Sequence, residues 1–472
     1  MQQMEILHVS FECYPVAKVG GLADVVGALS KYQQQAGNYV KVVMPMHRTT
    51  FLYENDWEVV HKGTFKLGIR LLDFTVIKEV GNKLGFDLYC VDVNGLLDRE
   101  KVYNYPDDTD RFLTFQVAVV EWLGSWQHRP DVVHVHDHHT ALIPFIMQQC
   151  FAYRHLAAVK TVLTIHNAEY QGWMKWQKGG ELPAWDTWNW GLLDWDNVIN
   201  SLAAGIKCAY QVNTVSPGYM TELMEQDSNL RPLFNTEAAK CHGILNGIDY
   251  SVWNPETDTL ILDNFNVKDV KAGKALNKKR LCDEFNLDPD YPLLVFIGRL
   301  VAEKAADLLA PAISKAFTVP NAAFNFLLLG SGEKGTEIAL ESLNNQHVGY
   351  YNSRIGYNET LSHQMYAGAD FILMPSRVEP CGLNQMYAMR YGTIPIVRKT
   401  GGLRDTVPDY EDPGGYGITF QQATVDDIVS AINRALILYT NKSKLQELRK
   451  KIMGLDWSWE VSAGKYIELY NK

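Results

Sequence analysis

Short apolar segments, each ending in a loop rich in glycine, proline or polar residues, recur along the whole chain of 472 residues. An amphipathic stretch follows most of them, and this alternation is typical of strands joined by crossover helices. We therefore expect an α/β protein whose sheets are mostly parallel. The expected strands are residues 6–11, 40–44, 87–91, 132–136, 162–166 and 211–216 in the first half, and 293–298, 324–329, 371–374 and 394–397 in the second.

A turn-rich stretch separates the two series of strands. It contains Asn246-Gly-Ile-Asp249 and Trp253-Asn-Pro255, so we place the domain boundary near residue 254. The simplest architecture for this pattern is two doubly wound, Rossmann-like domains, residues 1–254 and 255–455, that face each other across a cleft. In open α/β sheets ligands gather at the carboxyl ends of the strands, so the loops that follow the strands deserve most weight.

The balance of charge limits the class of ligand. Acidic residues number 54 and basic residues 44, and the formal net charge of −10 disfavours non-specific binding to nucleic acid or to an anionic membrane. A local basic pocket for one phosphate ligand remains compatible with this charge. Lys271, Lys274 and Lys278 share one face of a helix expected over residues 267–285, and we expect that face to be solvated.

Cysteine usage and the N-terminus indicate the compartment. The seven cysteines are scattered and include no CxxC pair, which argues against a disulfide framework and against a cysteine zinc site. The chain begins MQQMEILHVSFE, which reads as a strand rather than a signal peptide because no basic leader precedes it. Its apolar runs are shorter than the roughly 18 residues that a membrane span needs. We expect a cytoplasmic protein with no membrane partner.

The loop after the first strand contains two adjacent glycines, Gly20 and Gly21, close to Lys18. Paired glycines permit close backbone approach, the start of the next helix offers free N–H groups, and Lys18 adds a positive charge. An anionic group would be bound favourably there. The segment matches neither GxGxxG nor GxxxxGK[ST], so a tight strand-to-helix turn of purely structural purpose stays open as the alternative.

Two cations, Arg299 and Lys304, follow the first expected strand of the second half. A guanidinium fork and an ammonium together suit a diphosphate whose negative charge grows as its bond to a sugar breaks. The alternative is an exposed helix start with ion pairs to Glu303 or Asp307.

Two further loops of the second half have features that suit the same ligand. Glu379 precedes Cys381, Gly382 and Leu383, so a carboxylate that can hold sugar hydroxyls lies just before N–H groups at a helix start. Thr400 and Gly401 bring a second glycine pair after the next strand. Together with Lys18, these loops favour a nucleotide-diphosphate donor held across the cleft between the domains.

Histidines and tryptophans offer two weaker signals. His134 and His136 alternate onto one face of an expected strand and suggest a metal site, but HxH on a buried strand is more often core packing. His166 ends another strand, where a structural histidine is the usual interpretation. Packing onto the domain is preferred to stacking on sugar rings for the crowded tryptophans Trp173, Trp176, Trp185, Trp188, Trp190 and Trp195.

Taken together, these motifs resemble those of the bacterial and plant glycogen/starch synthase family, and their order and spacing cover nearly the whole chain. The motifs that carry the resemblance are Lys18-Val-Gly-Gly-Leu-Ala-Asp24, Asp137-His-His139, His166-Asn167, Asn246-Gly-Ile-Asp249, Arg299 to Lys304 and Glu379-Pro-Cys-Gly-Leu383. The resemblance implies the GT-B glycosyltransferase fold, with residues 1–254 on the acceptor side and residues 255–455 binding the nucleotide sugar. It also implies that residues 456–472 form a helix that crosses back to the first domain.

The resemblance also implies roles for single residues. Arg299 and Lys304 would bind the donor diphosphate and stabilise it as the leaving group, with Gly20, Gly21 and Lys18 approaching it from the other domain. Glu379 and the N–H groups of Cys381, Gly382 and Leu383 would hold the glucosyl hydroxyls, and His166 and Asn246 would line the sugar subsite. Tyr357 would stack on the base, Thr400 and Gly401 would bind the donor, and Asp137 would lie on the acceptor side.

The activity implied by the resemblance is transfer of glucose from ADP-glucose to the non-reducing end of an α-1,4-glucan such as glycogen. The family retains the α configuration and needs no metal or other cofactor, so we expect none here. Three positions depart from the family's usual residues: Ala305 stands where a glycine is usual, His138 where another aromatic is usual, and Asn384 where a threonine is usual. A methyl group at 305 would obstruct backbone approach or demand a different φ.

Other functions stay open at this stage. A synthase that uses UDP-glucose fits the same motifs, because nothing in the sequence separates adenine from uracil. A catalytically weakened glucan-binding protein is motivated by Ala305, although the presence of Lys18, Arg299, Lys304 and Glu379 together argues against it. An NAD oxidoreductase fits less well, because the GxGxxG fingerprint with its acidic partner is missing.

Overall fold

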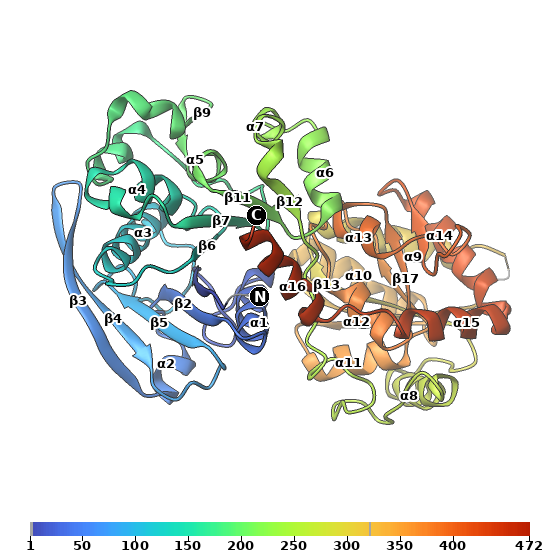
Figure 1. Cartoon of the computed structure of the whole chain (residues 1–472). Helices are drawn as coiled ribbons and strands as arrows, with labels where there is room; N and C mark the ends of the chain where they lie inside the picture. Colours follow the sequence, from blue (N-terminus) through green and yellow to red (C-terminus); the bar gives the residue numbers. More distant parts are fainter. Residues whose placement is uncertain (1–2, 321) are drawn as a thin grey trace. The chain divides into compact units, whose positions relative to one another are not determined.

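The computed structural model describes residues 3–320 and 322–472, and it divides into two compact units (Figure 1). Unit 1 comprises Met1–Asn246 and Trp459–Lys472, and unit 2 comprises Gly247–Ser458. The boundary expected near residue 254 therefore falls inside unit 2. The segment after Gly247 is tied to that unit, since the Ile248 amide donates to the Trp457 carbonyl over 2.8 Å.

Unit 1 is built on one large sheet in which strand β1 is central. The seven strands from β12 to β5 run parallel, and an antiparallel hairpin extends the sheet at the β5 edge. In spatial order the strands are β12 (Cys241–Gly243), β11 (Gln211–Thr214), β7 (Lys160–Ile165), β6 (Val132–His136), β1 (Glu5–Val9), β2 (Tyr39–Pro45), β5 (Asp87–Asp92), β4 (Arg70–Glu79) and β3 (Trp57–Leu67). The sequence pattern missed the hairpin, whose outer strand is largely exposed.

Helices connect these strands, and the last helix of the chain returns to unit 1. The helix expected near the C-terminus is α16 (Trp459–Tyr470), which packs beside α1 (Gly21–Gln35) and contributes to the same core. The other helical segments of unit 1 are α2 (Thr50–Glu54), α3 (Asp108–Gly124), α4 (Ile143–Gln149), α5 (Ser201–Cys208), α6 (Pro217–Glu225) and α7 (Arg231–Thr236), with 3₁₀ turns η1 (Phe151–Leu156), η2 (Trp176–Glu181), η3 (Thr187–Leu192) and η4 (Ala238–Lys240).

The tryptophan-rich region forms a small antiparallel sheet with two 3₁₀ turns. Its strands are β8 (Trp173–Met174), β10 (Val198–Asn200) and β9 (Asp194–Trp195). Half of the tryptophans pack against the core of unit 1, namely Trp176, Trp185 and Trp195. Trp173, Trp188 and Trp190 are exposed, so the expectation that packing accounts for this region holds for only part of it.

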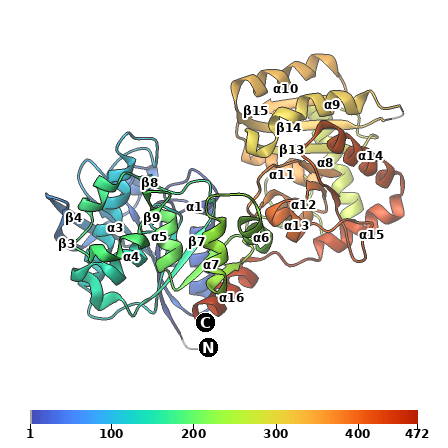
Figure 2. The same cartoon turned by 90° about the horizontal axis from the view of Figure 1, so that it is seen from above.

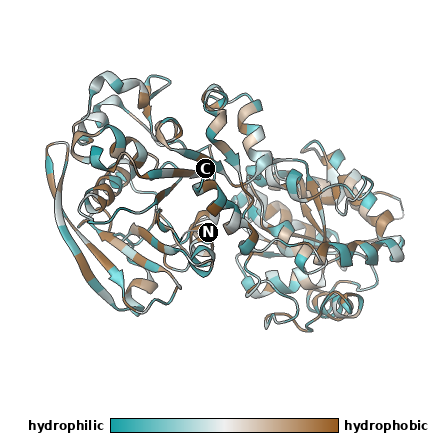
Figure 3. Cartoon of the chain, viewed as in Figure 1, coloured by the Kyte–Doolittle hydropathy of each residue, from teal (hydrophilic) through white to brown (hydrophobic). Residues whose placement is uncertain are grey.

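Unit 2 has a parallel sheet whose strand order is that of a doubly wound nucleotide-binding fold. Numbered from β13, the spatial order is 3-2-1-4-5-6, so the order reverses between β13 and β16. In space the strands are β15 (Tyr351–Ile355), β14 (Asn325–Gly332), β13 (Leu293–Leu300), β16 (Phe371–Met374), β17 (Ile394–Arg398) and β18 (Ile418–Phe420). The central strands β13, β16 and β17 are apolar (Figure 3) and largely buried, as expected of a sheet covered on both faces, whereas the edge strand β15 is polar and only partly buried.

Figure 2 shows strands β13, β14 and β15 between two groups of helices, with α9 and α10 on one side and α11 and α12 on the other. The helices of unit 2 are α8 (Val270–Phe285), α9 (Leu309–Phe317), α10 (Lys334–Gln346), α11 (Glu359–Gly368), α12 (Asn384–Arg390), α13 (Gly401–Thr406), α14 (Val425–Thr440) and α15 (Lys442–Met453), with 3₁₀ turns η5 (Ala302–Lys304) and η6 (Ala306–Leu308). The α/β class and the two Rossmann-like domains expected from the sequence are confirmed.

The lysine face of α8 is not solvated, so that expectation was wrong for two of its three residues. Lys274 and Lys278 are buried, and only Lys271 is exposed. The Lys274 ammonium donates to the carbonyls of Tyr366 and Ala367 at the end of α11 and to that of Tyr391 at the end of α12. Two helix C-termini thus bind this cation, which is favourable because their last carbonyls have no partner within the helix.

The seven cysteines are free thiols, all of them at least partly buried. Within the described ranges, none of the helices combines the length and the apolar character needed to cross a lipid bilayer.

Candidate active site

The predicted donor residues of unit 2 follow strands that are neighbours in its sheet. Strand β16 pairs with β13 on one side and with β17 on the other, and all three run parallel. Their carboxyl ends therefore meet at one edge, at the point where the strand order reverses and ligands bind in such folds. Arg299 lies at the carboxyl end of β13 and Lys304 just after it, Glu379 follows β16, and Thr400 follows β17.

Lys304 and Glu379 form a close ion pair. The Lys304 Nζ lies 2.6 Å from Glu379 Oε2, and the Ser376 hydroxyl donates to the same oxygen over 2.9 Å. Glu379 is buried and Lys304 half-buried, which makes this pair stronger than one on the surface. The structure thus brings together two residues predicted to bind different parts of the donor, and it adds Ser376.

Arg299 behaves differently from Lys304. Its side chain is 67% exposed and pairs with Glu303 at 3.2 Å, which is the ion pair that the structural alternative anticipated. Glu303 also anchors the loop after β16, because its carbonyl accepts from the amides of Arg377 and Val378. Arg377 in turn makes a bidentate ion pair with Asp307 over 2.6 and 2.8 Å, which lowers the pKa of that carboxyl. The loops that carry Lys304 and Glu379 are therefore tied together by several contacts.

Ala305, the departure from the family's usual glycine, adopts the left-handed conformation, with φ +53 and ψ +33. This conformation favours glycine, and alanine reaches it at a cost of roughly 1 kcal/mol. The residue is fully buried, and its amide donates to the Ala302 carbonyl over 2.9 Å. Ala305 thus occupies a region of φ that glycine adopts without strain.

The glycine pair Gly401 and Gly402 lies at the start of α13 and packs tightly against the loop that carries Glu379. A Cβ on Gly401 would overlap the carbonyl oxygen of Glu379, and one on Gly402 would overlap that of Cys381. Gly401 also has a φ of +43, which an L side chain rarely adopts. These glycines are required by packing between two loops, which accounts for the motif without a ligand. Thr400, just before them, is buried.

The segment Cys381 to Asn384 forms the turn that leads into α12. Gly382 has a φ of +73, and the buried Gln385 amide donates to the carbonyls of Cys381 and Gly382. Leu383 is the residue before the helix. Asn384, another departure, donates from Nδ2 to the Ile297 carbonyl over 2.7 Å and so fastens the start of α12 to β13.

Tyr357 follows β15 and is 85% exposed. It lies after Gly356, whose φ is +130. An aromatic ring this exposed has a face available to a planar group, which is compatible with the predicted stacking on a base.

In unit 1, the predicted residues lie at the equivalent place, where the strand order reverses between β1 and β6. Lys18, Gly20 and Gly21 form the loop from β1 to α1. Lys18 pairs with Asp24 at 2.7 Å, and both groups are partly exposed. A Cβ built on Gly20 or Gly21 would meet nothing within 4 Å, so packing inside the protein does not require these two glycines.

A residue that the sequence analysis did not single out, Glu12, organises this loop. Its carboxylate accepts hydrogen bonds from the amides of Val19 and Gly20 and from the Tyr103 hydroxyl. Burial is the main reason that its pKa is raised. An acidic residue at the end of an apolar strand, just before the glycine loop, was the signal in the sequence.

Asp137 and His166 are held together by a backbone contact. The Asp137 Oδ1 accepts from the His166 amide over 2.7 Å, and burial raises the pKa of Asp137 to about 7. Asp137 also has a φ of +55, so its carboxylate reaches this amide from a left-handed turn. The carboxylate is buried, whereas His166 is half-buried.

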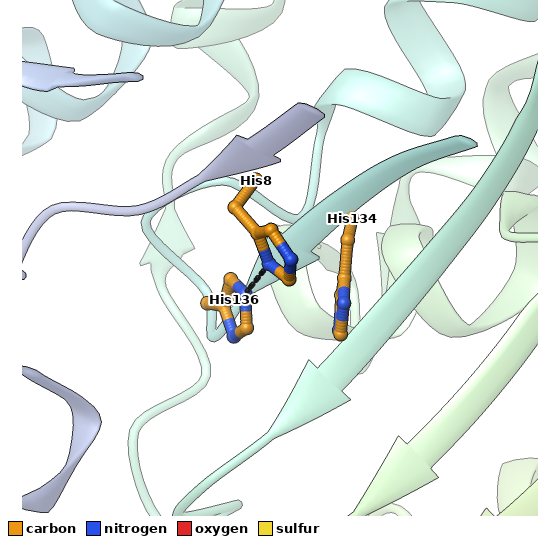
Figure 4. Close-up of side chains that lie close together, drawn as sticks. All are labelled: His8, His134 and His136. Carbon is orange, nitrogen blue, oxygen red and sulfur yellow. Dashed lines mark hydrogen bonds between the residues drawn. The ribbon is translucent and has the colours of Figure 1, made fainter. Parts of the chain in front are cut away.

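His134 and His136 lie with His8 in the core of the sheet (Figure 4), and their ring nitrogens come within 4.8 Å of one another. The His134 and His136 rings are stacked, with centroids 4.3 Å apart and an interplanar angle of 23°, and His8 faces His136 through ring nitrogens 3.1 Å apart. A metal must lie in the plane of each imidazole, about 2.0–2.1 Å from nitrogen, and the stacked planes of His134 and His136 do not converge on such a point. The geometry favours the interpretation as core packing over a metal site.

Of the remaining residues of unit 1 named from the sequence, His138 is half-buried and Asn246 is buried. His138, the third departure, contacts Phe112 edge-on at 5.6 Å between ring centroids, so it keeps the packing role of an aromatic residue. Asn246 is buried at the end of unit 1, and its Oδ1 has no hydrogen-bond partner among the residues that the structure describes. An unpaired buried acceptor costs free energy, so this atom suits a hydroxyl donor from a ligand.

Comparison with known proteins covers the chain from end to end. The model of the starch synthase catalytic domain matches residues 5–236, and that of glycosyl transferases group 1 matches residues 277–452. The chain is 53% identical over 468 residues to the glycogen synthase of Flavobacterium johnsoniae, with 99% of each chain covered. It is 36% identical to the glycogen synthase of a Hydrogenobaculum species, with 99% of this chain and 98% of that one covered.

Solved structures agree with this result. The catalytic domain of starch synthase IV from Arabidopsis thaliana, bound to ADP and acarbose, superposes with a TM-score of 0.88 at 32% identity, covering 100% of this chain and 99% of that one. Sucrose-phosphate synthase from Thermosynechococcus elongatus gives a TM-score of 0.62 at 18% identity over 99% and 98% of the two chains, which shows a shared fold.

Proposed function

The chain belongs to the bacterial and plant glycogen/starch synthase family and is a glucosyltransferase, and we propose that it transfers glucose from ADP-glucose to the non-reducing end of an α-1,4-glucan. The observation that carries this proposal is the Lys304–Glu379 pair where the strand order of unit 2 reverses. A cation and a carboxylate side by side suit a ligand that is anionic at one end and rich in hydroxyls at the other. The relative solved with ADP and acarbose supports the same choice of substrates.

On the donor side, we propose that Lys304 and Arg299 bind the diphosphate. Negative charge on the leaving ADP increases as its bond to glucose breaks, and two fixed cations stabilise that charge. Arg299 is exposed and pairs with Glu303 at the surface, so its guanidinium is accessible to a ligand. Lys18, with Gly20 and Gly21, would add to this site from unit 1, and Tyr357 would stack on the base.

On the sugar side, we propose that Glu379 accepts from glucosyl hydroxyls, with the amides of Cys381, Gly382 and Leu383 beside it. When the diphosphate attracts Lys304, the carboxylate becomes available to these hydroxyls. His166 and the unpaired Oδ1 of Asn246 would complete the sugar subsite from unit 1. Asp137 would lie on the acceptor side, acting through the backbone turn that it shares with His166.

We propose that the reaction retains the α configuration by a front-face mechanism. The bond from glucose C1 to the diphosphate oxygen breaks, and the acceptor 4-hydroxyl oxygen bonds to C1 on the same face. The hydroxyl proton passes to the departing diphosphate oxygen, so ADP leaves with that proton. This route needs no nucleophile from the enzyme. It depends instead on Lys304 and Arg299, which stabilise the negative charge of the leaving group.

We also propose that no divalent metal is required. Lys304 and Arg299 supply the charge that Mg²⁺ provides at many phosphate sites. Activity measured with and without chelator checks this: it should persist in excess EDTA, and a loss that added Mg²⁺ restores would contradict the proposal.

The test of the function is incorporation of labelled glucose into glycogen from ADP-glucose and from UDP-glucose, measured side by side. The proposal expects efficient transfer from ADP-glucose and an α-1,4-linked product. Preferential use of UDP-glucose would show that UDP-glucose, and not ADP-glucose, is the donor. Glucan binding without transfer from either donor would show a weakened, glucan-binding homologue.

A further inference from the structure

A continuous chain of buried polar side chains leads from the C-terminal helix to His166. It begins at the Tyr470 hydroxyl on α16, crosses Gln33 on α1, and continues through His8 on β1 and His136 on β6. The distances along it are 2.9 Å from Gln33 Nε2 to Tyr470 Oη, 2.8 Å from His8 Nε2 to Gln33 Oε1, 3.1 Å from His136 Nε2 to His8 Nδ1, and 3.1 Å from His166 Nε2 to His136 Nδ1.

Every imidazole in this chain is neutral at neutral pH. Burial lowers the pKa of His8 to about 4 and that of His166 to about 3, and it lowers the pKa of His136 well below the usual value. A neutral imidazole has one N–H and one lone pair. Each hydrogen bond between two such rings therefore needs an N–H on one ring and a lone pair on the other, so the tautomer of one histidine fixes the tautomer of the next.

The orientation of the Gln33 amide sets the direction of the hydrogen bonds along the chain. Its Nε2 donates to Tyr470 Oη, so its Oε1 faces His8 and must accept from His8 Nε2–H. The Nδ1 of His8 then has the lone pair and accepts from His136 Nε2–H. The Nδ1 of His136 accepts in turn from His166 Nε2–H.

A side branch is consistent with this direction. Because Tyr470 accepts from Gln33, its own proton is available to His134 Nδ1, 2.7 Å away. His134 then has its proton on Nε2 and donates to the Thr164 hydroxyl over 2.7 Å. No donor faces a donor, and no acceptor faces an acceptor, along either path.

We propose that this chain is a positioning device that holds His166 in one orientation and one tautomer, with the proton on Nε2 and the lone pair on Nδ1. Gln33, His8 and His136 are then positioning residues, and Tyr470 sets their direction from the end of the polypeptide. The consequence for activity rests on the proposed role of His166 in the sugar subsite, where Nδ1 would accept from a glucosyl hydroxyl. The tautomer itself does not depend on that role.

The direct test is nitrogen NMR of the full-length, unliganded protein labelled with ¹⁵N-histidine. The His166 signals are identified by their loss in His166→Gln. The proposal expects Nε2 protonated and Nδ1 unprotonated. A His166 that carries its proton on Nδ1, or that is charged at pH 7, overturns it whether or not the protein is a glucosyltransferase.

A matched pair of variants tests the origin of the direction. Tyr470→Phe removes the acceptor for the Gln33 amide, so either amide orientation leaves one buried atom unpaired, and both tautomers of His166 should be populated. Tyr466→Phe is the control, because Tyr466 lies on the same helix and its hydroxyl instead accepts from Asn213 Nδ2 over 3.0 Å.

The kinetic expectation for the same variants is a fall in kcat of about fivefold in Tyr470→Phe, the effect of one misdirected hydrogen bond, with little change in KM for the donor. Tyr466→Phe should keep the wild-type tautomer and the wild-type kcat. If Tyr470→Phe keeps one His166 tautomer, as the control does, Tyr470 does not set the direction. Should the Phe variant be too unstable to measure, the wild-type spectrum alone still decides the tautomer.

Discussion

Unit 1 and unit 2 place their predicted site residues at corresponding points of two doubly wound sheets, but with different chemistry. In unit 1, apart from the Lys18–Asp24 pair, the groups are histidines with lowered pKa values and the carboxyls Asp137 and Glu12 with raised ones. In unit 2 they are ion pairs, Lys304 with Glu379 and Arg299 with Glu303. Neutral chains fix direction without attracting counterions, whereas ion pairs can exchange partners with a charged ligand.

The two glycine pairs repeat this contrast. Gly401 and Gly402 are packed against the backbone of the neighbouring loop, so their role is explained within the protein. Gly20 and Gly21 have open space where a Cβ would lie. The same sequence device therefore serves packing in unit 2 and leaves backbone accessible in unit 1, and only the structure distinguishes the two.

The largest effect should come from removing the half-buried cation Lys304 of unit 2. Lys304→Ala should lower kcat by about 10²–10³-fold, the usual effect of losing one preorganised group that stabilises charge in the transition state. The matched control is Lys315→Ala, which removes an exposed cation paired with Asp426 on the same unit. Wild-type turnover in Lys304→Ala would contradict the donor assignment.

Next in size is the carboxylate that pairs with this cation. Glu379→Gln should lower kcat by about 10- to 100-fold, since the charged acceptor for the sugar is lost. Affinity for free ADP should stay equal or rise, because Lys304 no longer has an anionic partner. Calorimetry with ADP checks this, with Glu411→Gln, an exposed partner of Arg434, as the control. Weaker ADP binding in Glu379→Gln would mean that this carboxylate contributes to binding ADP, which contradicts its assignment to the sugar.

The glycine pairs should respond in opposite ways. Gly401→Ala should destabilise the protein by about 2–3 kcal/mol, because its Cβ overlaps backbone and its φ is positive. Gly20→Ala should change stability by less than about 0.5 kcal/mol but lower activity if the diphosphate approaches this backbone. Thermal unfolding and transfer assays on both variants measure the two effects. Equal destabilisation would remove the distinction between the pairs.

The smallest effect should come from the surface ion pair that ties the loops of unit 2. A double-mutant cycle with Arg377→Ala and Asp307→Ala should give a coupling free energy of about 0.5–1 kcal/mol, which decreases in high salt because both groups are partly exposed. A coupling that is insensitive to salt would mean that the pair acts through backbone contacts, such as the bond from Arg377 to the Ala302 carbonyl.

Much of the fold could be predicted from the sequence, because most of the buried parallel strands are rich in apolar residues. All ten expected strands occur, among them β6 (Val132–His136) and β16 (Phe371–Met374), whose residues are all buried. The hairpin of β3 and β4 was missed because its residues alternate only weakly between buried and exposed. The lysine face of α8 was misjudged because spacing shows which residues share a face, and only the packing of α11 and α12 shows that this face is buried.

The site divides in the same way. Loops that follow strands could be recognised from local motifs, so Lys304 and Glu379 were found. Ser376 was not, since a single serine carries no pattern, and Glu12 was overlooked although it ends an apolar strand just before the glycine loop. The chain from Tyr470 to His166 joins five separate segments, and nothing in the sequence relates them before the sheet and the C-terminal helix are in place.

Acid should distinguish unit 1, with its buried histidines of lowered pKa, from unit 2, whose site residues form ion pairs. A histidine with a lowered pKa stabilises the native state above about pH 6.5 and loses that contribution as pH falls toward its native value, about 4 for His8. The carboxyls Asp137 and Glu12, whose pKa values are raised, oppose this effect. In unit 2 the lowered carboxyl pKa values, such as about 2 for Asp409, cost stability only below about pH 4.

The measurement is hydrogen exchange of the unliganded enzyme at pH 7.5 and pH 5, read by mass spectrometry and corrected for the intrinsic rate of amide exchange. We expect backbone amides in peptides from β1, β6 and α16 to lose protection from exchange at pH 5, while those from β13 and β16 keep it. Equal loss in both units, or earlier loss in unit 2, would contradict this expectation.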